Sequence, residues 1–149
     1  VRALMRHLVV ERDEIVILDM EAGIEHLGRG TAARVDVLLS VSDANKKSLL
    51  TAATICRLAN EAGIPVAGIV ANRNATPEEE GIVRAFAREH GLAVLGSIPF
   101  DPAVMEAGIT GEPAGPRQSL AWNAVRELAG SVEKAKRPED YLRGTGTPG

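Results

Sequence analysis

The chain has few cysteines and no long apolar run. Cys56 is the only cysteine among 149 residues, so the chain cannot close a disulfide within itself, which favours a reducing compartment. No apolar run approaches the roughly 20 residues that a membrane-spanning helix needs, and no signal peptide is visible. From these absences we expect a cytoplasmic protein that does not act at a membrane.

An excess of positive charge is also lacking. The formal net charge is -3 at pH 7, which argues against a protein that binds nucleic acid through a general positive field. The 45% hydrophobic and 25% charged residues are typical of a globular domain. The length suits one domain with a buried core.

Apolar runs that read as strands alternate with helical patterns. The expected strands are at about 14–19, 37–41, 66–71 and 93–98, and the expected helices are 44–62, 76–90, 103–107 and 117–134. Strands that are hydrophobic throughout and are separated by helices indicate a parallel sheet covered on both faces. We therefore predict an α/β fold, a three-layer and mostly parallel sheet with helices on both faces.

Helical spacing predicts which residues of the expected helices face the core. Apolar or core positions at helical spacing are Leu49, Ala53, Cys56 and Ala59, then Ile82, Val83, Phe86 and His90, and last Leu120, Ala124, Val125, Leu128 and Val132.

Residues 1–10 read as a helix with no capping residue before Val1, so we interpret the chain as a fragment whose upstream half is absent. The polar residues 137–149 predict a disordered tail after a folded part over 1–136.

Residues 15–31 are the most informative stretch. The aliphatic residues 15–18 predict a fully buried strand that ends at Asp19. Ligands of open parallel sheets bind at the carboxyl ends of the strands, and an Asp there commonly orients Mg²⁺ on a nucleotide triphosphate. The Ala22-Gly23 pair lets the backbone approach a phosphate closely. A helix cap or a solvated loop acid is the alternative reading of Asp19.

With its elements in this order, the chain resembles the carboxyl-terminal portion of a MinD/ParA-class ATPase, a P-loop NTPase fold here lacking its first strands. Asp19-Met20-Glu21-Ala22-Gly23 fits the D-x-x-A-G switch of that class. Residues 23–31 are similar to the extension of CooC-type accessory proteins, which support nickel insertion into carbon monoxide dehydrogenase. Asn72-Arg73-Asn74 and Ile98-Pro99-Phe100-Asp101 follow later strands, where the class holds adenine.

This resemblance implies roles for particular residues. Asp19 would hold Mg²⁺, directly or through water, in a catalytic group with Glu21 and Gly23, whose backbone N–H would face the γ-phosphate. The adenine-binding group would be Asn72, Arg73, Pro99, Phe100 and Asp101. Glu25, His26 and Arg29 would form a switch that reports the nucleotide state to a second subunit or a client. Implied cofactors are ATP and Mg²⁺, with nickel or zinc in the complete protein, and implied partners are a second copy of the chain and carbon monoxide dehydrogenase or a related nickel enzyme.

The chain also departs from the class. Its lysines are Lys46, Lys47, Lys134 and Lys136, and none follows a glycine-rich phosphate loop. We therefore expect this chain alone not to hydrolyse ATP. Other interpretations of these residues stay open. Glu21 and Glu25 can be solvated loop acids, and Arg29 can form an ion pair with Glu25. His26 can be a structural histidine, and Asn72 can cap the turn after its strand. Glu78, Glu79 and Glu80 read as a solvated helix start.

Two other functions stay open. One is a spatial-organising ATPase that acts on a membrane or on DNA, which the break at Pro138 and the Gly-Thr-rich end disfavour. The other is a non-catalytic interaction domain that binds a partner through its sheet edge and loops.

Overall fold

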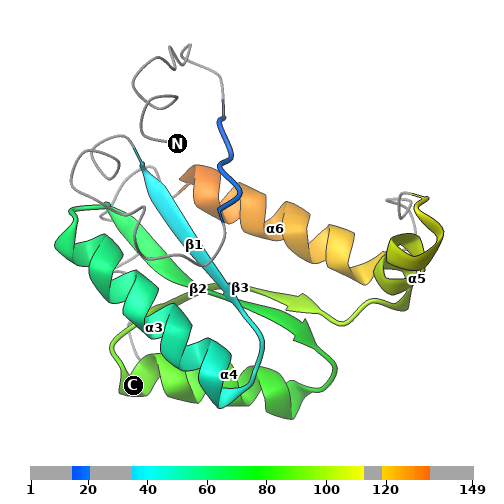
Figure 1. The fold of residues 1–149 in the computed structure, drawn as a ribbon, viewed down its shortest axis with the longest axis horizontal. Helices are drawn as coiled ribbons and strands as arrows, with labels where there is room; N and C mark the ends of the chain where they lie inside the picture. The colour runs from blue at the N-terminus through cyan, green and yellow to red at the C-terminus, as the bar shows by residue number, and fades with distance from the viewer. Residues whose placement is uncertain (1–14, 21–34, 113–118, 135–149) are drawn as a thin grey trace.

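A computed structural model describes residues 15–20, 35–112 and 119–134. Within these ranges the elements are β1 (Val37–Ser42), α3 (Lys46–Glu61), β2 (Val66–Asn74), α4 (Pro77–Glu89), β3 (Ala93–Pro99), α5 (Pro102–Thr110) and α6 (Leu120–Lys134) (Figure 1). The expected helix over residues 1–10 and the expected tail over 137–149 lie outside the described residues.

The described strands form one sheet in the order β1-β2-β3, and both pairs are parallel. Helix α3 packs on β1 and β2, α4 packs on β2 and β3, and α6 packs on β3. In Figure 1, α3 and α4 lie on one side of the sheet and α6 lies on the other. The predicted three-layer α/β sheet with helices on both faces is therefore confirmed.

Each face of the sheet has its own apolar core. The larger cluster, between the sheet and α3 and α4, contains the buried residues Leu49, Ala52, Cys56, Ile69, Ala71, Val83 and Ala87. On the opposite face, Val66, Val70 and Leu95 pack with Leu128 of α6. The predicted core position of Cys56 is confirmed, and burial raises the pKa of its thiol to about 11, so the thiol stays protonated at neutral pH.

Helix starts follow the local sequence signals. Thr76 caps α4 by accepting a hydrogen bond from the Glu79 backbone N–H at 3.3 Å, and Pro77 is the first helical residue. Asn45 caps α3 by accepting from the Ser48 N–H at 2.9 Å. Gly63 and Gly91, with φ of 85° and 65°, follow the ends of α3 and α4.

The expected strand at 14–19 is not observed in its described part. Residues 15–20 form no strand, and Ile15, Val16 and Ile17 are exposed, Ile17 by 86%. A strand needs a neighbour for its backbone N–H and C=O groups, and no strand within the described residues pairs with this segment. The prediction of a fully buried strand was therefore wrong for the described residues.

Helix faces and one helix end also differ from expectation. Ala52 rather than Ala53 is buried on α3, and on α4 Ala87 is buried while Ile82 is 50% exposed. On α6, Ala121 is buried, whereas Leu120 and Val125 are exposed. Small alanines face the sheet where the helices approach it, and helical spacing alone does not fix that rotation.

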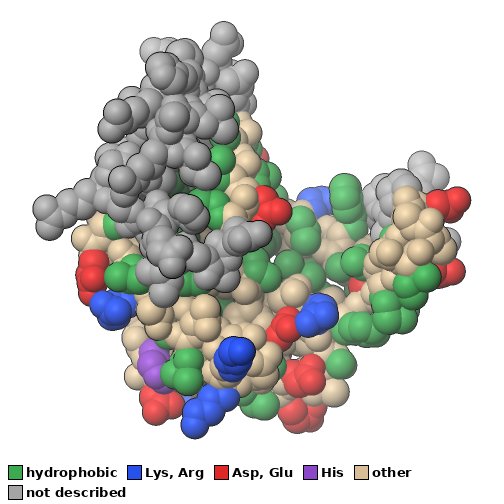
Figure 2. All heavy atoms as spheres, in the orientation of Figure 1, with side chains coloured by type: hydrophobic (Ala, Val, Ile, Leu, Met, Phe, Trp, Pro, Cys, Tyr) green, Lys and Arg blue, Asp and Glu red, His purple; other side chains and the backbone are tan. Residues whose placement is uncertain are grey.

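Helix α5 runs three residues past its expected end. Gly108 is accommodated inside the helix, and Gly111 ends it in the left-handed conformation at φ 76°, donating its N–H to the Ala107 carbonyl. The helix buries none of its residues. Its exposed apolar side chains include Val104, Met105 and Ile109, and Figure 2 shows hydrophobic side chains at the surface over this element.

Asp101 joins the starts of α5 and α6. Its buried carboxylate accepts hydrogen bonds from the Ala103 N–H at 2.9 Å, the Ser119 hydroxyl at 2.6 Å and the Ala121 N–H at 3.0 Å. The Ser119 hydrogen bond, followed by the Ala121 one, holds the pKa of Asp101 below its ordinary value. Ser119 in turn accepts from the Trp122 N–H at 3.0 Å, as an N-cap does.

The variant Ser119→Ala is expected to destabilise the protein. Loss of an N-cap serine costs about 1 kcal/mol, and loss of the hydrogen bond to Asp101 adds to this. Because the pKa of Asp101 is lowered by folding, its stabilisation is present above the ordinary Asp value and is lost as the pH falls through the lowered value. Denaturant unfolding should therefore show a larger difference between variant and wild type at pH 7 than in acid, where the loss of the N-cap hydrogen bond from the Trp122 N–H remains. Ser131→Ala, at an exposed position on α6, is the control, and an equal loss in both variants would contradict the role of Ser119.

Gly68 marks a close approach of β2 to β3. A Cβ atom there would lie 2.7 Å from Leu95 Cγ and 2.8 Å from the Ala93 carbonyl oxygen, so Gly68→Ala should lower the free energy of unfolding by about 1–3 kcal/mol. Gly81 of α4 has open space around it, so Gly81→Ala should raise that free energy by up to about 1 kcal/mol. Thermal unfolding of both variants measures this opposite response. A stable Gly68→Ala protein would contradict the observed strand packing.

Candidate functional site

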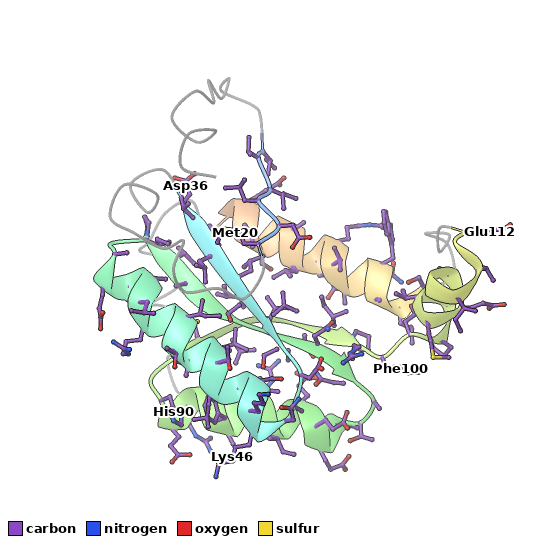
Figure 3. All side chains as sticks on the ribbon, viewed as in Figure 1. Met20, Asp36, Lys46, His90, Phe100 and Glu112 are labelled. Atoms are coloured by element: carbon purple, nitrogen blue, oxygen red, sulfur yellow. The ribbon has the colours of Figure 1, made fainter. Side chains whose placement is uncertain are left out.

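A hollow lies at the carboxyl edge of the sheet, where the end of β2 and the start of α4 meet the segments that follow β1 and β3. It has a volume of about 410 Å³, is open to solvent, and is lined by Asp43, Ala44, Asn45, Asn72, Arg73, Glu79 and Phe100. Ligand sites commonly have about 300–1,000 Å³. Figure 3 shows Phe100, after β3, at the opposite end of the sheet from Asp36, which precedes β1. The hollow is thus where parallel α/β sheets bind ligands.

An ion pair bridges the ends of β1 and β2 inside this hollow. Arg73 donates from Nε to Asp43 Oδ1 at 3.2 Å and from Nη2 to Asp43 Oδ2 at 2.5 Å. Asn72 donates from Nδ2 to Asp43 Oδ1 at 3.5 Å. The Arg73 hydrogen bond is the main reason that the pKa of the Asp43 carboxyl lies below its ordinary value, and the same contact raises the pKa of Arg73. Both groups are therefore charged at neutral pH.

The backbone at Arg73 is unusual. Its φ is 54°, and Arg73 is the one non-glycine residue with a positive φ in the described part of the chain. A side chain in this left-handed region is disfavoured and persists where surrounding contacts hold it. The two hydrogen bonds to the Asp43 carboxylate supply such contacts, and they also fix the position of the Arg73 guanidinium.

Phe100 is positioned by the backbone of β2. Its N–H donates to the Asn74 carbonyl at 2.9 Å, and its side chain remains 41% exposed beside the hollow. Glu79 accepts a hydrogen bond from the Ala75 N–H at 2.6 Å, which ties the start of α4 to the same edge. The site therefore offers an exposed aromatic ring, an amide, a guanidinium and carboxylates to a small polar ligand.

The structure brings together part of the predicted site. Asn72, Arg73 and Phe100 line the hollow, whereas Pro99 pairs with Asn74 in the sheet and is not part of the lining. Asp101 is also outside the lining, because its carboxylate caps α5 and α6. Asn72 contacts Asp43 across the strand ends rather than capping its own turn.

The rest of the predicted site is not tested by this arrangement. Asp19 is exposed in the described segment 15–20 and does not line the hollow. Glu21, Gly23, Glu25, His26 and Arg29 lie outside the described residues. Their roles stay predictions.

Four lining residues were not assigned to the site from the sequence, namely Asp43, Ala44, Asn45 and Glu79. The position of Asp43 directly after an apolar run that predicts a strand was the available signal, since it is the same signal that singled out Asp19. Glu79 was expected only to be solvated at a helix start, and its place in the hollow depends on how α4 packs.

Over 15–20, 35–112 and 119–134, no three His, Cys, Asp or Glu side chains lie close enough together to hold a metal ion. In those same ranges, no helix combines the length and the apolar character that crossing a bilayer requires.

Known proteins resemble this chain in sequence. The family model for 4Fe-4S iron sulfur cluster binding proteins of the NifH/frxC family matches residues 20–140. An uncharacterized ATP-binding protein of Methanocaldococcus jannaschii is 45% identical over 127 residues, which cover 85% of this chain and 48% of the relative. The carbon monoxide dehydrogenase accessory protein CooC of Rhodospirillum rubrum is 46% identical over 111 residues, which cover 74% of this chain and 41% of the relative. The chain thus spans about half the length of the curated relatives it matches.

The residues of this chain do not fit the iron–sulfur cluster in the family's description. Such clusters are held by several cysteine thiolates, and the 149 residues contain only Cys56. That thiol is fully buried in the apolar core, where its raised pKa disfavours the thiolate that a metal requires.

The fold has a solved counterpart. The crystal structure of the cell division ATPase MinD of Pyrococcus furiosus superposes with a TM-score of 0.54 at 24% identity, and the match covers 70% of this chain and 45% of that one. This likeness shows the fold alone. Together with the family match over residues 20–140, it confirms the resemblance to MinD/ParA-class ATPases of the CooC type, and the chain belongs to the NifH/frxC family.

Proposed function

We propose that this chain is the carboxyl-terminal part of an ATPase, with residues 1–136 in the ATPase domain and 137–149 as a tail. Its hollow receives the adenine of ATP. The observation that carries this proposal is the meeting of Asn72, Arg73 and Phe100 in one hollow at the carboxyl edge of a parallel sheet. The ATP-binding names of relatives at 45% and 36% identity support it.

Adenine recognition uses the groups that the hollow presents. The Asn72 amide has both a donor and an acceptor for the amino and ring-nitrogen edge of adenine. The exposed ring of Phe100 offers an apolar surface on which a base can stack. Pro99 and Asp101 hold the backbone of this wall through strand pairing and helix capping.

Hydrolysis requires groups beyond the hollow. In this proposal Asp19 orients Mg²⁺ directly or through water, Glu21 belongs to the same catalytic group, and the Gly23 N–H faces the γ-phosphate. A glycine-rich lysine loop in the upstream part of the complete polypeptide cradles the phosphates. Glu25, His26 and Arg29 carry the nucleotide state to the second subunit of a homodimer.

The proposed role of this ATPase is nickel insertion into carbon monoxide dehydrogenase or a related nickel enzyme. Support comes from the 46% identity to the Rhodospirillum rubrum accessory protein, whose name gives that client. The nickel is cargo that passes to the client, and nickel or zinc ligands lie in the complete protein.

Replacing Asn72 tests adenine recognition. In the complete polypeptide, Asn72→Ala should weaken ATP binding about tenfold, because two hydrogen bonds of about 0.5–1.5 kcal/mol each are lost. Titration with a fluorescent ATP analogue measures the affinity. Asn123→Ala, at an exposed position of α6 outside the hollow, is the matched control. Equal affinities for the two variants would contradict an adenine site in the hollow.

Replacing Asp19 tests hydrolysis. In the complete polypeptide, Asp19→Ala should abolish Mg²⁺-dependent phosphate release, because the ion loses the carboxylate that orients it. Asp36→Ala removes an exposed carboxylate at the amino end of β1 and should leave turnover unchanged. Unchanged turnover in Asp19→Ala would refute the role of Asp19. The same two variants, incubated with apo carbon monoxide dehydrogenase, nickel and ATP, test the client: only Asp36→Ala should restore its activity.

A further inference from the structure

The contact between Asp43 and Asn72 fixes which way the Asn72 amide is turned. An ionised carboxylate only accepts hydrogen bonds, and the Asn72 atom that faces it is Nδ2, 3.5 Å from Oδ1. The opposite orientation would set the amide oxygen against the carboxylate, acceptor against acceptor. The amide therefore keeps its NH₂ group on the Asp43 side, and its carbonyl oxygen is left for another donor.

Asp43 is itself held in place. The guanidinium of Arg73 binds both of its carboxylate oxygens in the bidentate geometry that Arg and a carboxylate favour. The left-handed backbone at Arg73, φ 54°, turns the chain so that residues 72 and 73 both reach the same carboxylate. The three residues form a unit in which Arg73 orients Asp43 and Asp43 orients Asn72.

We propose that Asp43 is a positioning residue that makes this site select a 6-aminopurine over a 6-oxopurine. With its orientation fixed, the Asn72 amide presents its carbonyl oxygen and its second N–H to the base. These match a 6-amino donor beside a ring-nitrogen acceptor. A 6-oxo group would bring a second acceptor to the carbonyl oxygen and be rejected. This inference rests on the proposed function, since it assigns the base to the hollow.

The test compares ATP with ITP, whose base carries a 6-oxo group, on the complete polypeptide. The ratio of the two dissociation constants is measured by competition against a fluorescent nucleotide. Asp43→Ala should lower the preference for ATP about tenfold, the effect of one mismatched hydrogen bond, because the amide can then turn over. Arg73→Gly should act in the same direction, since glycine keeps the left-handed backbone while Asp43 loses its anchor.

Two controls separate positioning from general damage. Glu61→Ala breaks an exposed ion pair with Arg57 on α3 and should leave the ratio unchanged. In an Asn72→Ala background, Asp43→Ala should produce no further change in the ratio, because the group that it orients is gone. A structural role of Asp43 would lower both affinities together and act equally in either background.

The outcomes distinguish this inference from the proposed function. An unchanged ATP to ITP ratio in both Asp43→Ala and Arg73→Gly, with Asn72→Ala still impaired in ATP binding, overturns the positioning role alone. Full ATP affinity in Asn72→Ala overturns the adenine site and the inference with it. Arg73→Gly carries the test if Asp43→Ala does not fold.

Discussion

Parallel pairing of β1, β2 and β3 is the constraint on which the candidate site depends. Because both pairs are parallel, the carboxyl ends of the three strands lie at one edge of the sheet. Asp43, Asn72 and Phe100 are far apart in the sequence and meet there for that reason alone. Helices cover both faces of the central strand β2, so its carboxyl end is where its polar side chains reach solvent and a ligand.

Asp43 and Asp101, which both follow strands, show how the hydrogen-bond partners of a carboxylate determine its role. Asp43 follows β1, binds Arg73 and Asn72, and faces the hollow. Asp101 follows β3, but the hydroxyl of Ser119 and two backbone N–H groups occupy its carboxylate. Hydrogen bonds lower the pKa of both groups, yet only Asp43 is placed to act on a ligand, while Asp101 holds the wall beside it.

In the proposed function, different parts of the chain bind the base and act on the phosphates. The hollow offers contacts suited to a base, and the motif beginning at Asp19 has the residue types that act on phosphates and Mg²⁺. A phosphate loop is absent from these 149 residues, whose four lysines lack the glycine pattern. Cys56, the one cysteine of these 149 residues, does not supply the several thiolates of the iron–sulfur cluster that the family's description names.

The sequence by itself determined the layers of the fold, the start of α4 at its cap Thr76, and three of the residues in the hollow. These depend on local signals: continuous apolar strands, capping side chains, and motifs that follow strand ends. Only the tertiary structure decided that α3 buries Ala52, that Glu79 joins the hollow, and that Arg73 pairs with Asp43. Helix rotation and contacts between residues 30 positions apart follow from packing against the sheet, which no local pattern specifies.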